Sequence, residues 1–192
     1  NVSHELKTPI FSIQGYLLTL LEGGLEDPNI NVNYLQRANK SVDRMIALID
    51  DLDEITKLES GSIDMNLSKV DLSALTVEVI HALEIKAKKD KVNLVFANEP
   101  LKPVWVIADA ARINQVLVNL IVNSIKYGKE GGESRIKFFD MGDNFLVEVA
   151  DNGQGIAEEH LSRLFERIYR TDKGRDRNSG GPGLGLSIVK HI

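Results

Sequence analysis

The chain has 192 residues, of which 43% are hydrophobic and 27% are charged, and its formal net charge is −5. This composition is ordinary for a globular protein of one or two domains. The acidic balance argues against nucleic-acid binding, which depends on basic patches, and the absence of cysteine excludes disulfides and cysteine-ligated metal sites. No apolar run approaches the roughly 18 residues that a membrane-spanning helix needs.

The first predicted element is a helix over residues 2–21, which ends at Gly23-Gly24. Its apolar residues recur every three or four positions and therefore share one face. These residues are Leu6, Ile10, Ile13, Leu17 and Leu20. At about 100° per residue, His4 points roughly 160° away from the centre of that face. We therefore expect His4 to be exposed to solvent or to a partner.

His4 is the first candidate catalytic residue. A neutral imidazole at pH 7 is a usable nucleophile, and the neighbouring Glu5 carboxylate could accept a ring proton. The Thr8 hydroxyl lies one helical turn further on, along the same face. The simpler interpretation is that His4 is a solvated surface histidine. Motifs elsewhere in the sequence are needed to choose between this interpretation and a catalytic role.

A second helix follows, with apolar positions at alternating spacings of four and three, the heptad pattern. Its heptad positions are Tyr34, Ala38, Ser41, Met45, Leu48, Leu52 and Ile55. Two helices with such narrow apolar faces cannot bury them alone, so we expect two copies of the hairpin to form a dimeric four-helix bundle. Packing of the hairpin against the rest of its own chain is the alternative. Phe11 and Leu18 lie near His4 on the helical wheel and predict a docking partner there.

The pattern changes near residue 66, so we predict two domains, residues 1–66 and 67–192. After a polar connection over residues 62–68, the second domain reads as a helix, two strands, a helix and two strands. The expected ranges are Asp71 to about Lys89, Asn93 to Ala97, Val104 to Ala108, Ala110 to Tyr127, Ile136 to Phe139 and Phe145 to Ala150. This order predicts an α/β sandwich with helices on one side of a mixed sheet, and an α+β chain overall.

The helix over residues 110–127 carries a polar stripe beside its apolar one. The stripe consists of Arg112, Gln115, Asn119, Asn123 and Lys126. Asparagine is a poor residue in the interior of a helix, so two asparagines one turn apart suggest a function. An amide oxygen suits Mg²⁺, and a lysine suits phosphate. A solvated polar face is the alternative.

Two glycine-rich segments complete the set of candidate sites. Asp151 follows a strand and precedes Gly153 and Gly155, so its carboxylate could accept a hydrogen bond from an exocyclic amine such as that of adenine. Residues 180–186 are rich in glycine and open a helix, where backbone amides can approach phosphates. Residues 166–181 are polar and are interpreted as a mobile loop over the nucleotide. Each glycine run alone could be only a turn.

Taken together, these motifs resemble those of the sensor histidine kinases of bacterial two-component systems over essentially the whole chain. Residues 3–9 (SHELKTP) are similar to the histidine box, and residues 119–127 (NLIVNSIKY) to the asparagine box. Residues 151–155 are similar to the first glycine box, residues 164–167 to the phenylalanine box and residues 181–186 to the second glycine box. Ser124 departs from the alanine that is common in the family.

The resemblance implies a dimerisation and histidine-phosphotransfer hairpin followed by an ATP-binding domain of the Bergerat (histidine kinase ATPase) type, with its last strands expected after Ile192. It implies catalytic roles for His4, Glu5 and Thr8, with Thr8 positioning water for dephosphorylation of the partner, and Mg²⁺ binding by Asn123. It also implies an ATP site. The implied ATP-binding residues are Asn119, Asn123, Lys126, Tyr127, Asp151, Gly153, Gly155, Ile156, Arg170, Gly181, Gly183, Leu184, Gly185 and Leu186.

The resemblance further implies an ATP-dependent protein-histidine autokinase that passes its phosphoryl group to an aspartate of a response regulator receiver domain, in signal transduction. It implies a homodimer and a cytoplasmic fragment of a protein anchored in the membrane upstream. Two other functions stay open: a nucleotide-regulated binding scaffold, and a Bergerat-type ATPase. Gln115 stands where such ATPases carry a catalytic glutamate, which counts against hydrolysis to water.

Overall fold

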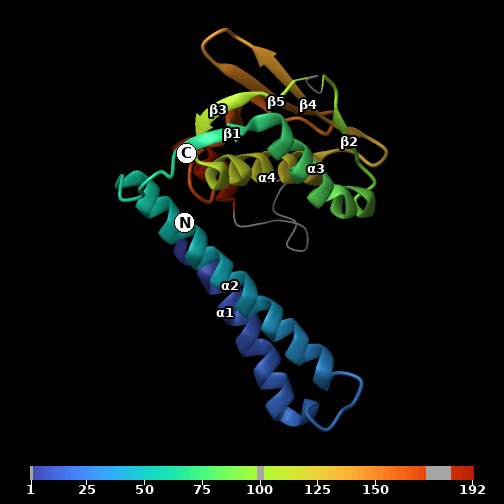
Figure 1. Ribbon diagram of the computed structural model, residues 1–192. Helices are drawn as coiled ribbons and strands as arrows, with labels where there is room; N and C mark the ends of the chain where they lie inside the picture. The colour runs from blue at the N-terminus through green and yellow to red at the C-terminus, as the bar shows by residue number, and fades with distance from the viewer. Residues whose placement is uncertain (1, 99–101, 172–182) are drawn as a thin grey trace.

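The computed structural model describes residues 2–98, 102–171 and 183–192. It consists of a long helical hairpin and an α/β domain at one end of that hairpin (Figure 1). The start of the first helix and the end of the chain both lie near the α/β domain, and the turn of the hairpin lies at the far end. Within the described ranges, no helix is both long and apolar enough to cross a lipid bilayer.

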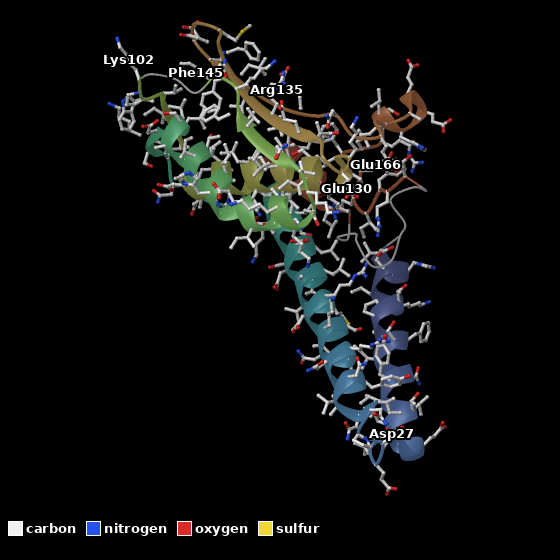
Figure 2. The ribbon with its side chains drawn as sticks, turned by 90° about the vertical axis from the view of Figure 1, so that its right-hand side faces the viewer. Asp27, Lys102, Glu130, Arg135, Phe145 and Glu166 are labelled. Carbon is white, nitrogen blue, oxygen red and sulfur yellow. The ribbon has the colours of Figure 1, made fainter. Side chains whose placement is uncertain are left out.

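The hairpin is built from α1 (Val2–Thr19), a π-type turn η1 (Leu20–Gly24) and α2 (Asn31–Glu59). Gly23 has a φ of 109°, which residues with a Cβ rarely adopt, so the glycine pair ends the helix as expected. At the tip of the hairpin, the Asp27 carboxylate accepts the backbone N–H of Asn29 at 2.8 Å (Figure 2). The heptad positions that become buried are Ala38, Leu48 and Ile55.

One copy of the hairpin leaves much of its apolar surface uncovered. Ile10 and Leu17, both on the predicted apolar face of α1, remain 47% and 45% exposed. Phe11 and Leu18 on the adjoining surface are also exposed. Apolar surface repeated along a helix at this spacing is typical of an interface with another helix.

The α/β domain begins with a strand that the sequence did not reveal. No strand was expected between the polar connection over residues 62–68 and the helix that begins at Asp71, but β1 (Ser68–Asp71) pairs antiparallel with β3 (Trp105–Ala108). Its four residues include one buried side chain, Val70, which is too little for an alternating pattern to be recognised. The helix that follows, α3 (Leu72–Lys89), begins as predicted, because the Asp71 side chain accepts the backbone N–H groups of Ser73 and Ala74.

The remaining strands form a second sheet in the order β2–β4–β5, from β2 (Asn93–Phe96), β4 (Glu133–Asp140) and β5 (Phe145–Asp151). β2 runs parallel to β4, and β4 runs antiparallel to β5. The predicted sandwich is confirmed, with the difference that its strands divide into a two-stranded and a mixed three-stranded sheet. α4 (Ala110–Tyr127) has the predicted bounds.

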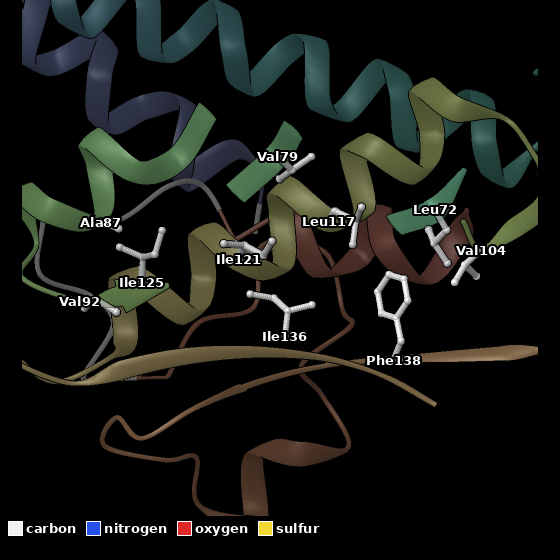
Figure 3. Packing of buried hydrophobic residues seen from close by; sticks show 10 residues of the cluster. All are labelled: Leu72, Val79, Ala87, Val92, Val104, Leu117, Ile121, Ile125, Ile136 and Phe138. Atoms are coloured by element: carbon white, nitrogen blue, oxygen red, sulfur yellow. The ribbon is translucent and has the colours of Figure 1, made fainter. Parts of the chain in front are cut away.

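The core of the domain lies between these helices and the three-stranded sheet (Figure 3). Ile121 and Ile125 from α4 meet Ile136 from β4, and all three are almost completely buried. The buried Ser124 hydroxyl hydrogen-bonds to the hydroxyl of Ser134 on β4 and donates to the carbonyl of Ile121 at 2.8 Å. A serine at position 124 is therefore satisfied within the core, as a buried polar group must be.

The last part of the chain packs between the hairpin and the domain. After the short α5 (Glu158–Leu161), α6 (Gly185–His191) contacts both α2 and α4. Leu184 and Ile188 form a second core, the interdomain core, with Leu48 and Ile55 of α2.

The packing of the main core predicts which substitutions destabilise the domain. Ile121→Ala removes a side chain with no exposed surface and leaves a cavity, so we expect the free energy of unfolding of the domain to fall by about 2–5 kcal/mol. Ile107→Ala, at a position that is 71% exposed on β3, is the control and should change stability by less than about 0.5 kcal/mol. Urea unfolding followed by circular dichroism measures both, and equal effects of the two substitutions would contradict this assignment of the core.

Candidate functional site

A cavity of about 730 Å³ lies along α4, with walls from β5, the segment around α5, the segment ending at Thr171 and the start of α6. It gathers most of the residues expected to bind ATP. Those that line it are Asn119, Asn123, Lys126, Tyr127, Asp151, Gly155, Ile156, Arg170, Gly183, Gly185 and Leu186. A volume of this size suits a nucleotide-sized ligand.

The polar stripe of α4 forms one wall of this cavity. Gln115, Asn119 and Asn123 follow one another at intervals of one helical turn and all line it. The Nδ2 atom of Asn119 is buried and has no hydrogen-bond partner. A Cβ at Gly185 would lie 3.2 Å from Oδ1 of Asn119, so the start of α6 lies against this asparagine.

Lys126 is held at the far end of α4. Its Nζ donates to the Tyr127 hydroxyl at 2.8 Å and lies 4.4 Å from the centre of the Tyr127 ring. The ammonium group is therefore positioned by the aromatic ring beside it.

The first glycine segment lies at the same end of α4 as Lys126, where the Asp151 turn meets Tyr127. The Asp151 carboxylate accepts the backbone N–H of Gly153 at 2.8 Å. A Cβ at Gly153 would lie 2.0 Å from the carbonyl oxygen of Tyr127, so only glycine lets this turn pack against the end of α4. Gly153 itself is absent from the lining of the cavity, and its role is to bring the Asp151 turn against α4.

Arg170 lines the cavity from the segment that ends at Thr171. Its Nε and Nη2 atoms are buried without a hydrogen-bond partner. A Cβ at Gly183 would lie 3.0 Å from Cγ of Arg170, and Gly183 has a φ of 79°, so glycine is required beside this arginine. Buried donors without a protein partner need one from water, an ion or a ligand, and the charged donors of Arg170 suit an anionic group.

Leu184 was expected to contact the nucleotide, but the structure places it elsewhere. It is completely buried in the interdomain core against Leu48 and Ile55. Gly181, another expected binding residue, lies outside the described residues, as does most of the predicted mobile loop over residues 166–181.

Several cavity residues were not predicted. Tyr169 is held by His160, whose Nδ1 is 2.7 Å from its hydroxyl, and by the Arg163 guanidinium 4.3 Å from the ring centre. Asp51 comes from α2, in the other domain, and no local pattern could have connected it with the cavity. The further unpredicted lining residues include Val149, Gln154, Leu161 and Thr171.

The candidate catalytic residues of α1 form a separate group. His4 is exposed, as predicted, and the Thr8 hydroxyl donates to the carbonyl of His4 at 3.2 Å. An oxygen of Glu5 lies 4.0 Å from Nη2 of Arg44 on α2. In the described part of the chain, no residue of α1 lines the cavity, so this arrangement does not bring His4 to the ligand site.

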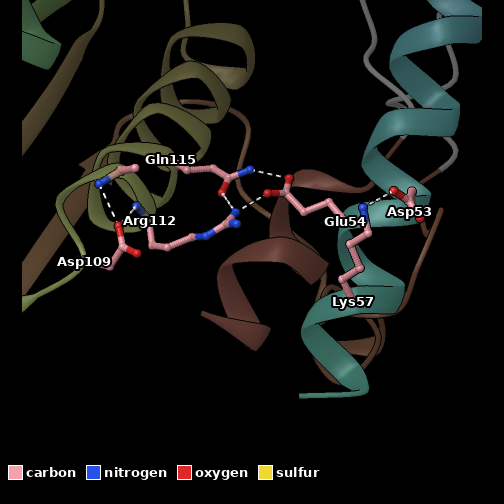
Figure 4. A network of polar contacts seen from close by, with 7 residues as sticks. Asp53, Glu54, Lys57, Asp109, Arg112 and Gln115 are labelled. Carbon is pink, nitrogen blue, oxygen red and sulfur yellow. Dashed lines mark hydrogen bonds and ion pairs between the residues drawn. The ribbon is translucent and has the colours of Figure 1, made fainter. Parts of the chain in front are cut away.

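Polar contacts hold α2 against α4 (Figure 4). The Glu54 carboxylate binds the guanidinium of Arg112 and accepts Nε2 of Gln115 at 2.6 Å. Arg112 also lies in the first turn of α4, which the Asp109 carboxylate caps. Backbone amides, that of Asn66 first among them, hold the pKa of the Asp109 carboxyl below its usual range. We call Glu54, Arg112 and Gln115 the Glu54 network.

Comparison with known proteins decides the family. Residues 1–61 match the model of the His Kinase A (phospho-acceptor) domain, and residues 108–192 match that of the histidine kinase-, DNA gyrase B- and HSP90-like ATPases. The catalytic domain of histidine kinase ThkA is 33% identical, with 67% of this chain and 80% of that chain covered and a TM-score of 0.56. The chain belongs to the bacterial sensor histidine kinases.

Other histidine kinases match both domains together. Acinetobacter baumannii histidine kinase AdeS has a TM-score of 0.75 at 27% identity, with 98% of this chain and 84% of that chain covered. A structure of ThkA in complex with the response regulator protein TrrA has a TM-score of 0.72 at 28% identity, with 88% and 49% covered. Sensor protein kinase WalK of Staphylococcus aureus is 33% identical over the whole of this chain, which spans 46% of that protein.

The close contact between Gly153 and the end of α4 predicts that a larger residue at position 153 lowers stability, with or without a ligand. Gly153→Ala places a methyl group against the carbonyl of Tyr127, so the turn must move, and we expect a loss of about 1–3 kcal/mol in stability. Gly15→Ala is the control, because a Cβ there meets nothing within 4 Å and alanine favours the α1 helix. Thermal unfolding of both variants measures this, and an unchanged melting temperature for Gly153→Ala would contradict the described packing.

Proposed function

We propose that the chain is an ATP-dependent autokinase that phosphorylates His4 and transfers the phosphoryl group to an aspartate of a response regulator. One observation carries the proposal: a cavity with unpaired buried donors on Asn119 and Arg170 lies in the same chain as an exposed histidine on a helical hairpin. We place the phosphotransfer hairpin at residues 1–66 and the ATP-binding domain at residues 67–192. The chain spans less than half the length of WalK. The activity of the whole protein is therefore our proposal and is not taken over from that relative.

In the proposed complex, the nucleotide lies along α4. The Asp151 carboxylate accepts the exocyclic amine of adenine at the Tyr127 end. Arg170 and Asn119 donate to the phosphates, where backbone amides near Gly183 and Gly185 add further donors.

Mg²⁺ fits this site through Asn123. Its amide oxygen supplies one hard ligand, and the phosphates and water supply the others, which is the usual arrangement for this ion. Over residues 2–98, 102–171 and 183–192 no three His, Cys, Asp or Glu side chains gather to hold a metal. When bound there, the ion would neutralise charge on the transferring phosphoryl group.

The chemical step takes place at His4. A neutral ring nitrogen attacks the γ-phosphorus, the bond to the bridging oxygen breaks, and ADP leaves. Glu5 accepts the ring proton that the phosphorylated imidazole releases. The receiver aspartate then attacks the same phosphorus and frees the histidine. Thr8 positions water for the reverse signal, dephosphorylation of the regulator.

His4 must meet the nucleotide in another arrangement, because α1 contributes no described residue to the cavity. Either the ATP-binding domain moves along its own hairpin or it acts on the hairpin of a second copy. We propose that two copies pair through the exposed apolar face that includes Ile10 and Leu17. Phe11 and Leu18, which lie on the same side of α1 as His4, then remain for the response regulator; ThkA, a relative, has been solved in complex with one.

We also propose that this part of the protein lies in the cytoplasm. An ATP-dependent kinase without cysteine fits the reducing, ATP-rich cytoplasm. Anchoring in the membrane through a segment upstream of this chain is part of the same proposal.

The phosphorylation site is tested with γ-labelled ATP. His4→Gln should abolish labelling and leave nucleotide binding unchanged, because the histidine and the cavity lie in different domains. His81→Gln, which alters another exposed histidine on α3, is the matched control and should label normally. The label should be lost in acid and kept in alkali, as phosphohistidine requires. Labelling that persists in His4→Gln would place the acceptor elsewhere.

The nucleotide site is tested by two conservative changes. Asp151→Asn keeps an acceptor for the N–H of Gly153 but loses the charge that faces adenine, so we expect about tenfold weaker binding with an unchanged response to Mg²⁺. Asn123→Ala should remove the Mg²⁺ dependence of binding. Isothermal titration calorimetry with a non-hydrolysable ATP analogue, with and without Mg²⁺, separates these effects. Unchanged affinity in both variants would reject the site.

A further inference from the structure

One residue of the nucleotide cavity comes from the helical hairpin. Asp51 of α2 lines the cavity together with Gln115 of α4. It is held there by the Glu54 network, because Glu54 lies one turn further along α2 and binds both Arg112 and Gln115. The wall of the cavity therefore includes a carboxylate that is present only while α2 lies against α4.

The position of Asp51 along the cavity follows from α4. Gln115, next to α2, and Tyr127, next to the Asp151 turn, are separated by twelve residues, or about 18 Å of helix. Asn119, with its unpaired donor, lies one turn from Gln115. A nucleotide whose base is bound by Asp151 therefore extends its phosphates toward the end of the cavity where Asp51 lies.

The surroundings of Asp51 are acidic. Asp51 also lines a groove of about 390 Å³, together with the carboxylates of Asp50, Asp53 and Glu54 and the cations Lys57 and Arg112. Lys57 is paired with Asp53 at 2.6 Å, and Arg112 with Glu54. Burial raises the pKa of the Asp51 carboxyl, and the charges of Glu54 and Asp50 raise it further. Another anion brought close to Asp51 would be opposed by the same charges.

We propose that Asp51 is an affinity-determining residue of the nucleotide cavity: its carboxylate repels the phosphates of a bound nucleotide for as long as α2 lies against α4. Nucleotide binding and the contact between α2 and α4 then oppose each other, and by linkage each weakens the other. The inference rests on the proposed nucleotide site. The affinity for nucleotide is then lower while α2 lies against α4 than in an arrangement in which the ATP-binding domain has moved away from α2.

The test compares two substitutions with the same change in net charge. Asp51→Asn should tighten binding of a non-hydrolysable ATP analogue about 3- to 10-fold, the size expected for one charge removed at moderate distance. The gain should be larger without Mg²⁺, when the phosphates carry more negative charge, and smaller at 0.5 M salt than at about 0.05 M salt, because salt screens the repulsion. Asp53→Asn alters an exposed residue of the same helix that does not line the cavity, and should leave the affinity unchanged.

Titration calorimetry on the whole chain decides the question. Equal affinities of Asp51→Asn and the unaltered chain would overturn the inference alone, as would an equal gain in Asp53→Asn. Weaker binding of the Mg²⁺-bound nucleotide by Asp51→Asn would instead make Asp51 a ligand of the ion. Failure of the unaltered chain to bind nucleotide would contradict the proposed function itself, and the inference with it.

Discussion

The arrangement of the two domains depends on a small apolar contact, the packing of Leu184 and Ile188 against Leu48 and Ile55 in the interdomain core. All four side chains are almost completely buried, and each such side chain contributes about 1.5–3 kcal/mol through its removal from water. Ile188 also lines the cavity along α4, so α6 has one side on the hairpin and the other on the proposed ligand site. The seven residues of α6 therefore connect the hairpin contact with the proposed ligand site in space.

Polar contacts set the register of this packing without supplying most of its energy. The Glu54 network joins α2 to the first turns of α4, and Glu59 at the end of α2 binds Arg167 and lies 3.4 Å from Nε2 of His191. Exposed or half-exposed ion pairs of this kind contribute little each, but their directions fix which residues of α2 face the cavity. Asp51 is one of the α2 residues that face the cavity. The proposed repulsion between its carboxylate and bound phosphates follows from this position.

The sequence correctly predicted features that depend on the residues of a single helix or strand. α4 carries an apolar stripe over five turns and has the predicted bounds, and the Asp71 cap marks the start of α3. β1 was missed because four residues with one buried side chain carry no pattern, and its partner β3 lies more than thirty residues away. Leu184 was predicted to contact the nucleotide, and Asp51 was not predicted to line the site. Both residues make contacts between the two domains, and such contacts join positions that follow no regular spacing in the sequence. The unpaired donors of Arg170 became visible only once its surroundings were known.

Amide hydrogen exchange along α6 tests most directly whether the interdomain core holds this helix in place. Leu48→Ala removes a side chain of α2, distant in sequence from α6 but buried against Leu184 and Ile188. The account predicts that the amide of Ile188, which donates to the carbonyl of Leu184 at 3.0 Å, exchanges at least about tenfold faster in this variant, while amides around Val79 in α3 keep their rates. Unchanged exchange at Ile188 would show that α6 is ordered without the hairpin and would contradict the coupling between the two domains.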